Sequence, residues 1–307
     1  MIKVLTYLTV YIFSILVTIA QIKTEEITIH NMAIQLPGTL SYSQENTPLI
    51  IWVHGSGQID RNGNQPAQNV KANYIQQFRD AINKENIAFF SYDKRTANPN
   101  NKNFLKDTQV LDFAYDAEEV VNYFKKDKRF SEIILIGHSQ GSLVAMLASE
   151  KVDTYISIAG AGETVDQTII KQVTAQSIEF GEIAKAHFKE LKETGTVENV
   201  NPNLISIFAK PNQAFWSSWI SLDPVEEIKK LQIPVLILNG DKDLQVQIED
   251  ANNLKAAKPT AELVIIKNMN HVLKNIQKDE DNLTSYFSSE FAISEALIRT
   301  VVSFVKK

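Results

Sequence analysis

Short, nearly continuous apolar runs recur along the chain and are separated by segments with a different pattern. These runs cover residues 49–53, 87–92, 133–136, 155–158, 234–238 and 263–266. Runs of this length without alternation are typical of strands buried on both faces, as in a parallel sheet covered by helices. An earlier segment, residues 26–40, alternates weakly and predicts an edge hairpin whose strands end near Pro37 and Gly38.

The segments between the apolar runs carry apolar residues at helical spacing. They cover residues 73–86, 110–125, 142–149, 248–257 and 294–305. Alternation of buried strands with amphipathic helices predicts an α/β fold with a doubly wound, mostly parallel sheet.

One stretch, residues 165–222, contains no convincing strand. Residues 174–192 are amphipathic and helical, and a more apolar part follows with Phe215, Trp216 and Trp219. We predict a helical cap over the carboxyl ends of the strands, where ligands bind in such sheets. The three aromatic side chains either form a small core of the cap or line a substrate pocket. The α/β core would then comprise residues 21–164 and 223–307.

Composition narrows the function classes. The 307 residues carry a net charge of −5, with 44% apolar and 22% charged residues, which gives no basic excess for nucleic-acid binding. Cysteine is absent, which excludes a disulfide framework, a thiolate metal site and a cysteine nucleophile. Histidines and carboxylates do not cluster with metal-ligand spacing, so neither a metal nor a cofactor is expected.

The N-terminus predicts export. Lys3 precedes an uncharged apolar run over residues 4–19, and Thr18 and Ala20 are small residues at positions −3 and −1 of a cleavage site before Gln21. These features indicate a secretory signal peptide at residues 1–20, and therefore a periplasmic or secreted protein without a stable membrane span. The alternative is an N-terminal membrane anchor, although the run is shorter than the roughly 20 residues that a span needs.

The strongest chemical signal is the G-x-S-x-G sequence at residues 137–141, which follows an apolar run and opens a predicted helix. In this context the central Ser139 is expected to be a nucleophile on a tight strand-to-helix turn. Gly137 and Gly141 would let the strand and the helix approach each other. The helix N-terminus would direct its amides toward a developing oxyanion.

A serine hydroxyl needs a base and a group that orients that base. His271 follows the last predicted strand, from which it can reach the serine at the same sheet edge. The side chain of His138, next to the serine in the motif, is expected to point away from the site. For the acid, Asp241 and Asp243 compete in the loop after the preceding strand. Asp243 stands three residues after Gly240 and is preferred, while Asp241 is typical of a residue that stabilises a turn.

The oxyanion also needs donors. The sequence His54-Gly-Ser-Gly57 follows the first central strand, and its glycines form a flexible turn. We expect the backbone N–H groups of Ser56 and Gln140 to form the oxyanion hole, with Gly57 as an alternative to Ser56. His54 is expected to be a structural hydrogen-bonding residue.

Together these residues resemble the α/β-hydrolase superfamily from about Pro48 to the C-terminus. The H-G-S-G loop that continues into Asp60-Arg61, and Tyr-Asp-Lys-Arg at residues 92–95, are similar to bacterial esterases of the serine-aminopeptidase and acylglycerol-lipase branch. That branch commonly has a proline where this chain has Gln58. The resemblance implies a cap between the sixth and seventh strands of the core. Ion pairs within these two stretches would brace the loops beneath the site, or would be ordinary solvated pairs.

The resulting hypothesis is a serine esterase that acts on a small-molecule ester through an acyl-enzyme, with Ser139, His271 and Asp243 as its triad. A serine peptidase or amidase with the same triad is one alternative. A non-catalytic binding protein on the same scaffold is another. The sequence specifies neither the acyl chain nor the oligomeric state.

Overall fold

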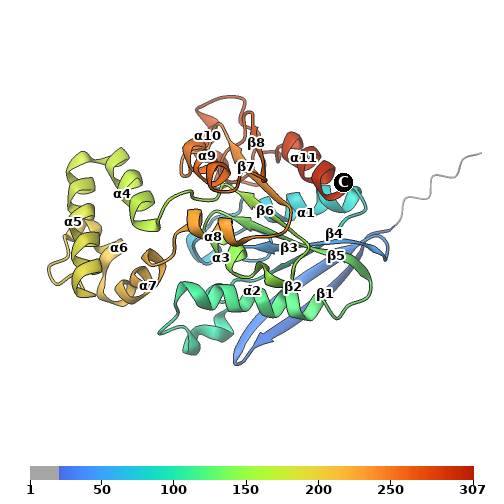
Figure 1. Cartoon of the computed structure of the whole chain (residues 1–307), viewed down its shortest axis with the longest axis horizontal. Coiled ribbons are helices and arrows are strands. Elements are labelled where there is room, and N and C mark those ends of the chain that lie inside the picture. The colour runs from blue at the N-terminus through green and yellow to red at the C-terminus, as the bar shows by residue number, and fades with distance from the viewer. Residues whose placement is uncertain (1–20) are drawn as a thin grey trace, which may run out of the picture.

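The computed structural model describes residues 21–307, so the predicted signal peptide at residues 1–20 lies outside the described residues. Its centre is an eight-stranded sheet in the order β1-β2-β4-β3-β5-β6-β7-β8 (Figure 1). The strands are β1 (Lys23–Asn31), β2 (Ile34–Tyr42), β3 (Thr47–Val53), β4 (Ala88–Tyr92), β5 (Phe130–His138), β6 (Thr154–Ile158), β7 (Val235–Gly240) and β8 (Glu262–Ile266). From β4 to β8 across the sheet all neighbours are parallel, whereas β1 and β2 pair antiparallel. The predicted doubly wound, mostly parallel α/β fold is confirmed.

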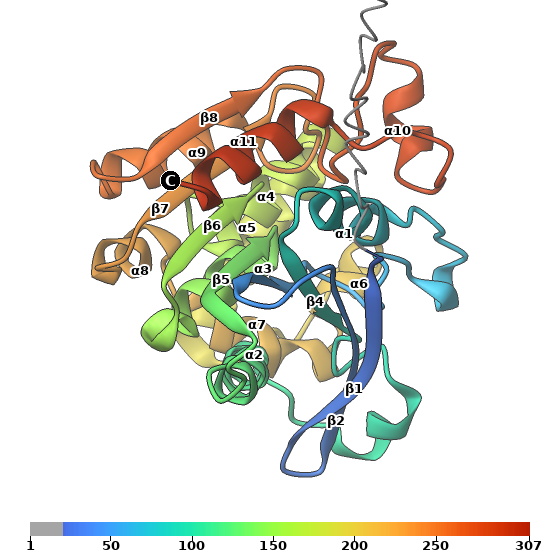
Figure 2. The same ribbon diagram turned by 90° about the vertical axis from the view of Figure 1, so that its right-hand side faces the viewer.

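Helices cover both faces of the sheet, which explains why its strands lack alternation. Along β3, Ile50 and Trp52 face one buried cluster, and Leu49, Ile51 and Val53 face the other. The first cluster is covered by α1 (Tyr74–Lys84) and α11 (Glu295–Val305). The second is covered by α2 (Val110–Phe124), α3 (Gln140–Leu147), α8 (Pro224–Lys230) and α9 (Ile248–Ala257). Figure 2 shows α1 and α11 on one side of the twisted sheet and α2 on the other.

Short elements complete the core. They are the helix α10 (Asp281–Ser285) and the 3-10 turns η1 (Pro66–Gln68), η2 (Pro99–Phe104) and η3 (Ser149–Lys151).

The edge hairpin differs from its prediction. Its strands do not end near Pro37 and Gly38: β2 continues through both residues, and the turn lies at Met32 and Ala33, where Met32 has a φ of +52°. Gly38 is required by packing, because a Cβ there would lie 2.3 Å from the ring of Phe90 on the adjacent β4. The glycine therefore marks a close approach inside a strand, and not its end.

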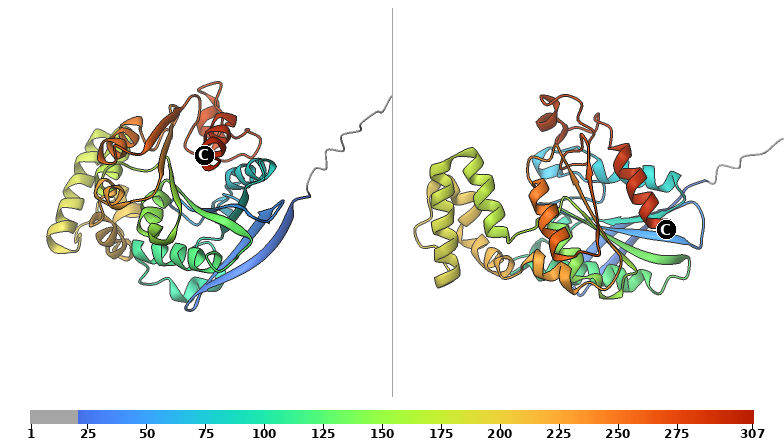
Figure 3. Two further views of the ribbon diagram at one scale, coloured as in Figure 1. Left: turned by 45° about the vertical axis from the view of Figure 1, so that its right-hand side comes forward. Right: turned by 45° about the horizontal axis from the view of Figure 1, so that its top comes forward.

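Residues 165–222 fold into helices that project from one end of the sheet (Figures 1 and 3). They are α4 (Val165–Gln176), α5 (Ile178–Thr194), η4 (Pro202–Leu204), α6 (Ile205–Phe208) and α7 (Lys210–Ile220). The predicted continuous helix over residues 174–192 is interrupted at Ser177, which has an extended backbone and caps α5 by accepting a hydrogen bond from the N–H of Phe180. We call residues 165–222 the cap.

The cap has its own buried cluster, which includes Phe188, Leu191 and Phe208. None of the helices in residues 21–307 is long and apolar enough to span a bilayer.

Candidate active site

Ser139 occupies a strained turn between β5 and α3. Its φ of +55° and ψ of −124° lie where side chains other than glycine are rare. The space for this turn depends on two glycines. A Cβ on Gly137 would lie 2.3 Å from the carbonyl oxygen of Gly141, and a Cβ on Gly141 would lie 2.3 Å from that of Val53. The G-x-S-x-G spacing therefore follows from backbone contacts on both sides of the serine.

His271 and Asp243 form a buried hydrogen-bonded pair. Nδ1 of His271 lies 2.8 Å from Oδ2 of Asp243, and the two residues are 4% and 7% exposed. The other carboxylate oxygen, Oδ1, accepts hydrogen bonds from the N–H groups of Gln245 and Val246 at 2.7 and 3.0 Å. These bonds hold the carboxylate in one orientation. Asp241 instead accepts a hydrogen bond from the backbone N–H of Asn268 at 2.6 Å, as the turn prediction requires.

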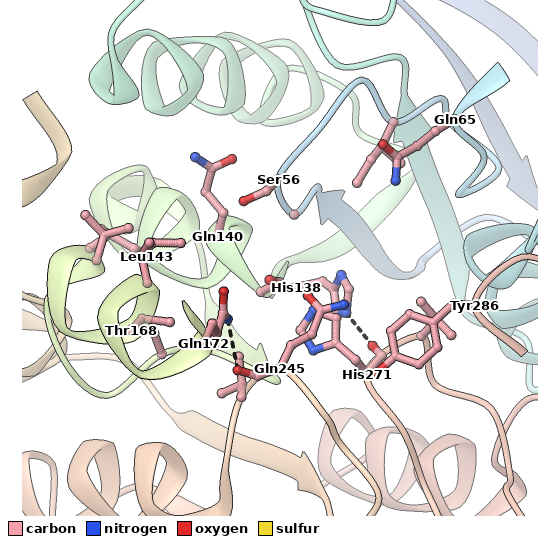
Figure 4. A pocket seen from close by; sticks show the side chains of 18 of the residues that line it. Ser56, Gln65, His138, Gln140, Leu143, Thr168, Gln172, Gln245, His271 and Tyr286 are labelled. Atoms are coloured by element: carbon pink, nitrogen blue, oxygen red, sulfur yellow. Dashed lines mark hydrogen bonds between the residues drawn. The ribbon is translucent and has the colours of Figure 1, made fainter. Parts of the chain in front are cut away.

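A cavity of about 440 Å³ lies beneath the cap and is lined by both Ser139 and His271, whereas Asp243 does not line it. Six of the predicted site residues line it: Ser56, Ser139, Gln140, Trp216, Trp219 and His271. Figure 4 shows Ser56 and Gln140 on one part of its wall and His271 on another. The cap is joined to the core at this cavity, because Nε2 of Gln172 on α4 donates to the backbone oxygen of Gln245 at 3.1 Å (Figure 4).

The three aromatic residues of α7 divide between the two predicted roles. Trp216 and Trp219 line the cavity with stacked rings whose centroids are 5.6 Å apart. Trp216 also belongs to the cap core, since its Nε1 donates to the backbone oxygen of Ile207 at 2.7 Å. Phe215 does not line the cavity. Its ring packs edge-on against Phe113 of α2, so it joins the cap to the main core.

The two segments predicted to bind the oxyanion both adjoin Ser139. Gly55 is in close contact with the serine, because a Cβ on Gly55 would lie 3.1 Å from the Cβ of Ser139. Gln140 is the first residue of α3, so its N–H has no acceptor within the helix. The structure therefore brings Ser56 and Gln140 to the same cavity as the serine.

His138 was expected to point away from the site, and this expectation was wrong. Its ring centroid is 4.9 Å from that of His271, and its Nε2 donates to the backbone oxygen of His271 at 2.8 Å. Burial lowers the pKa of His138 to about 3, so the ring is neutral. It supports the loop that carries His271. The motif position alone gave no indication of this contact, because the contact joins the end of β5 to the loop after β8.

His54 is also a buried, neutral residue, as predicted. Its Nε2 bonds to the backbone oxygen of Tyr92, and burial lowers its pKa to about 4.

These two histidines predict acid sensitivity. Both folded-state pKa values lie below the unfolded value of 6.5, so below pH 6.5 the unfolded chain binds more protons and stability falls. Between pH 6.5 and pH 5 each histidine should cost roughly 2 kcal/mol of unfolding free energy. Urea denaturation of His54→Gln and His138→Gln should show a flatter pH dependence than the wild type. His30→Gln, at an exposed position, is the control. Unchanged slopes in both buried variants would contradict the assignment.

The two charged stretches noted in the sequence form ion pairs beneath the site. Asp93 binds Arg61 through two side-chain hydrogen bonds of 3.0 and 2.9 Å. Arg95 binds the buried Asp116 of α2 in the same two-point manner, at 2.6 and 2.8 Å. Both pairs brace loops at the carboxyl ends of the strands. Within residues 21–307, no group of three or more histidine and carboxylate side chains is arranged to hold a metal ion.

Comparison with models of known protein families shows to which family the chain belongs. A model of the BD-FAE family matches residues 32–257, which is more than half of the 307 residues. The chain belongs to the BD-FAE family. The region that matches the BD-FAE model contains Ser139 and Asp243 and ends before His271.

Esterases are among the relatives of this BD-FAE family member. Esterase EstD of Thermotoga maritima is 24% identical over 253 residues, which cover 78% of this chain and 58% of EstD. The chain thus spans less than two thirds of the length of EstD.

Solved structures show the same fold. Est1E from Butyrivibrio proteoclasticus matches with a TM-score of 0.58 at 18% identity, covering 92% of this chain and 99% of Est1E. The Pyrococcus furiosus esterase Pf2001 matches with a TM-score of 0.59 at 16% identity, covering 92% and 91%. The predicted resemblance to α/β-hydrolases is confirmed.

Proposed function

We propose that this protein hydrolyses carboxylic esters of small molecules, with Ser139 as nucleophile, His271 as base and Asp243 as the orienting acid. The observation that carries the proposal is that His271, which Asp243 orients through a 2.8 Å hydrogen bond, lines the same cavity as Ser139. The names of EstD, Est1E and Pf2001 as esterases support the reaction class.

The mechanism follows from which ring nitrogen of His271 carries the proton. With Nδ1–H donated to Asp243, Nε2 carries a lone pair and can take the hydroxyl proton of Ser139 as its oxygen attacks the ester carbonyl. The tetrahedral oxyanion accepts hydrogen bonds from the N–H groups of Ser56 and Gln140. His271 then gives its proton to the departing alcohol, which leaves an acyl group on Ser139.

Water completes the cycle. It gives a proton to His271 while its oxygen attacks the acyl carbonyl, and Ser139 regains the proton when the carboxylic acid leaves. Asp243 stays ionised throughout and stabilises the charged imidazolium.

Hydrolysis of p-nitrophenyl esters from acetate to palmitate tests this proposal. We expect purified protein to cleave the short and medium chains best, because a cavity of about 440 Å³ suits small ligands. Methyl ferulate belongs in the series, since Est1E was solved with ferulic acid bound. Ser139→Ala should remove both the hydrolysis and the labelling by a fluorophosphonate.

Two outcomes would contradict the proposal. Hydrolysis that persists in Ser139→Ala would exclude this serine as the nucleophile. Absence of wild-type activity on every ester, with cleavage of aminoacyl arylamides instead, would identify an amidase.

Export directed by residues 1–20 remains a proposal from the sequence alone.

A further inference from the structure

Lys94 is a buried basic residue with no role in the mechanism above. It follows β4 by two residues and is 5% exposed. Because β4 lies parallel to β3 in the sheet, the loops that follow both strands meet at the same edge. The ammonium of Lys94 therefore reaches beneath residues 54–58, which we call the oxyanion loop.

The ammonium makes two hydrogen bonds, and both lead to the predicted oxyanion hole. Nζ donates to the backbone oxygen of Gly55 at 2.7 Å and to the side-chain oxygen of Gln140 at 2.7 Å. These acceptors belong to the oxyanion loop and to the first residue of α3. One buried donor thus joins the two segments that supply the predicted N–H groups.

The bond to Gly55 determines the direction of a predicted donor. The carbonyl of Gly55 and the N–H of Ser56 belong to one planar peptide unit, and in a trans peptide they point in opposite directions. When the carbonyl points down to Lys94, the N–H must point away from it. A charged donor also polarises the peptide and strengthens its N–H as a donor.

The surroundings show that the charge is directed at the loop and not at a carboxylate. The nearby carboxylate of Asp116 is already bound at two points by Arg95. The ring of Phe113 lies 4.3 Å from Nζ and closes off the other side. Burial lowers the pKa of Lys94 to about 7, which reflects the cost of holding an ammonium there.

We propose that Lys94 is a positioning residue that holds the Gly55–Ser56 peptide and Gln140 in the orientation that binds the oxyanion. The inference rests on the proposed ester hydrolysis and deepens it. Lys94 itself touches neither the substrate nor the reacting atoms.

Lys94→Met tests the inference, because methionine has a similar length and no donor. We expect kcat to fall about 10- to 100-fold, which does not exceed the loss caused by removing a whole oxyanion donor. KM should change less than about threefold. The affinity for a phenylboronic acid, which forms a tetrahedral anion on the serine, should fall by a similar factor. If the substitution only disturbed substrate packing, KM would rise, and kcat and boronate affinity would not fall together.

Thr96→Val is the matched control. Thr96 belongs to the same loop as Lys94, and its hydroxyl donates to the backbone oxygen of Gly57 at 3.2 Å. That carbonyl shares its peptide unit with the N–H of Gln58, which is not a predicted oxyanion donor. We expect its kcat to stay within about threefold of the wild type.

A second variant keeps the test decisive if Lys94→Met does not fold. Gln140→Met removes the other acceptor of Lys94 and keeps the backbone N–H of residue 140. This variant should lower kcat and boronate affinity together, by a smaller factor than Lys94→Met does. In a folded double variant the two losses should be less than additive, because both act on one network.

The inference is overturned if a folded Lys94→Met keeps wild-type kcat and boronate affinity, or if it loses only what Thr96→Val loses. When Lys94→Met cannot be studied, unchanged kcat and affinity in Gln140→Met overturn it. Failure of the proposed function is a separate result, since it would appear as an absence of Ser139-dependent hydrolysis in the wild type.

Discussion

Asp243→Asn is expected to lower kcat for ester hydrolysis by about 10⁴-fold with little effect on folding. The physical reason is the tautomer of His271. An asparagine amide that donates to Nδ1 leaves the proton of the ring on Nε2, where it faces the serine. A ring in this state cannot accept the hydroxyl proton, although the geometry of the site is preserved.

Asp241→Asn is the matched control, because the two aspartates stand two residues apart in one loop. The carboxylate of Asp241 accepts a hydrogen bond from the backbone N–H of Asn268, and the amide oxygen of asparagine can do the same. We expect kcat within about threefold of the wild type for this variant. The two variants are compared by steady-state kinetics on the best p-nitrophenyl ester. If Asp241→Asn were the inactive one, the orienting role would belong to Asp241.

The sheet could be predicted closely because burial on both faces leaves a simple pattern. The apolar runs 133–136 and 155–158 lie within β5 and β6, and the helix predicted over residues 248–257 has the bounds of α9. The edge hairpin was predicted less well. One face of the edge strand β1 is exposed, and β2 carries polar residues between its apolar ones, so the apolar pattern is weak. The glycine that Phe90 requires was taken for the end of a strand.

The candidate site could be predicted as far as chain order and motif spacing reach. Motif spacing depends on a residue and its neighbours in sequence, as for Ser139 in its pentapeptide and Asp243 after Gly240. Chain order then places His271 after both. The contacts of His138 and Lys94 could not be predicted. Each joins segments at the carboxyl ends of different strands, and side-chain direction at such a junction depends on the packing of both segments.

The cap shows a similar limit. The aromatic stretch of α7 could be recognised, yet its three rings do not all point in the same direction from the helix. Trp216 and Trp219 face the cavity, and Phe215 faces α2. Composition predicts that such rings are buried, but the orientation of the helix decides which of them a substrate can meet.

Gly137→Ala is expected to have the largest effect on stability. The added Cβ would lie 2.3 Å from the carbonyl oxygen of Gly141 and 2.6 Å from the Cα of Ser142. Both atoms belong to the backbone of α3, so relief requires moving the helix and with it the strained turn at Ser139. We expect the free energy of unfolding to fall by about 3 kcal/mol or more, together with a loss of esterase activity.

Gly195→Ala separates this steric effect from the general cost of replacing a glycine. Gly195 ends α5 with a φ of +78°, and a Cβ there would meet no heavy atom within 4 Å. Its replacement should cost only about 1–2 kcal/mol, from the left-handed backbone alone, and should leave hydrolysis intact. Urea denaturation and p-nitrophenyl ester hydrolysis measure both variants. Equal losses in the two would mean that α3 can move away from β5 at little cost, and then the close approach of strand and helix would not be what holds Ser139 in its strained conformation.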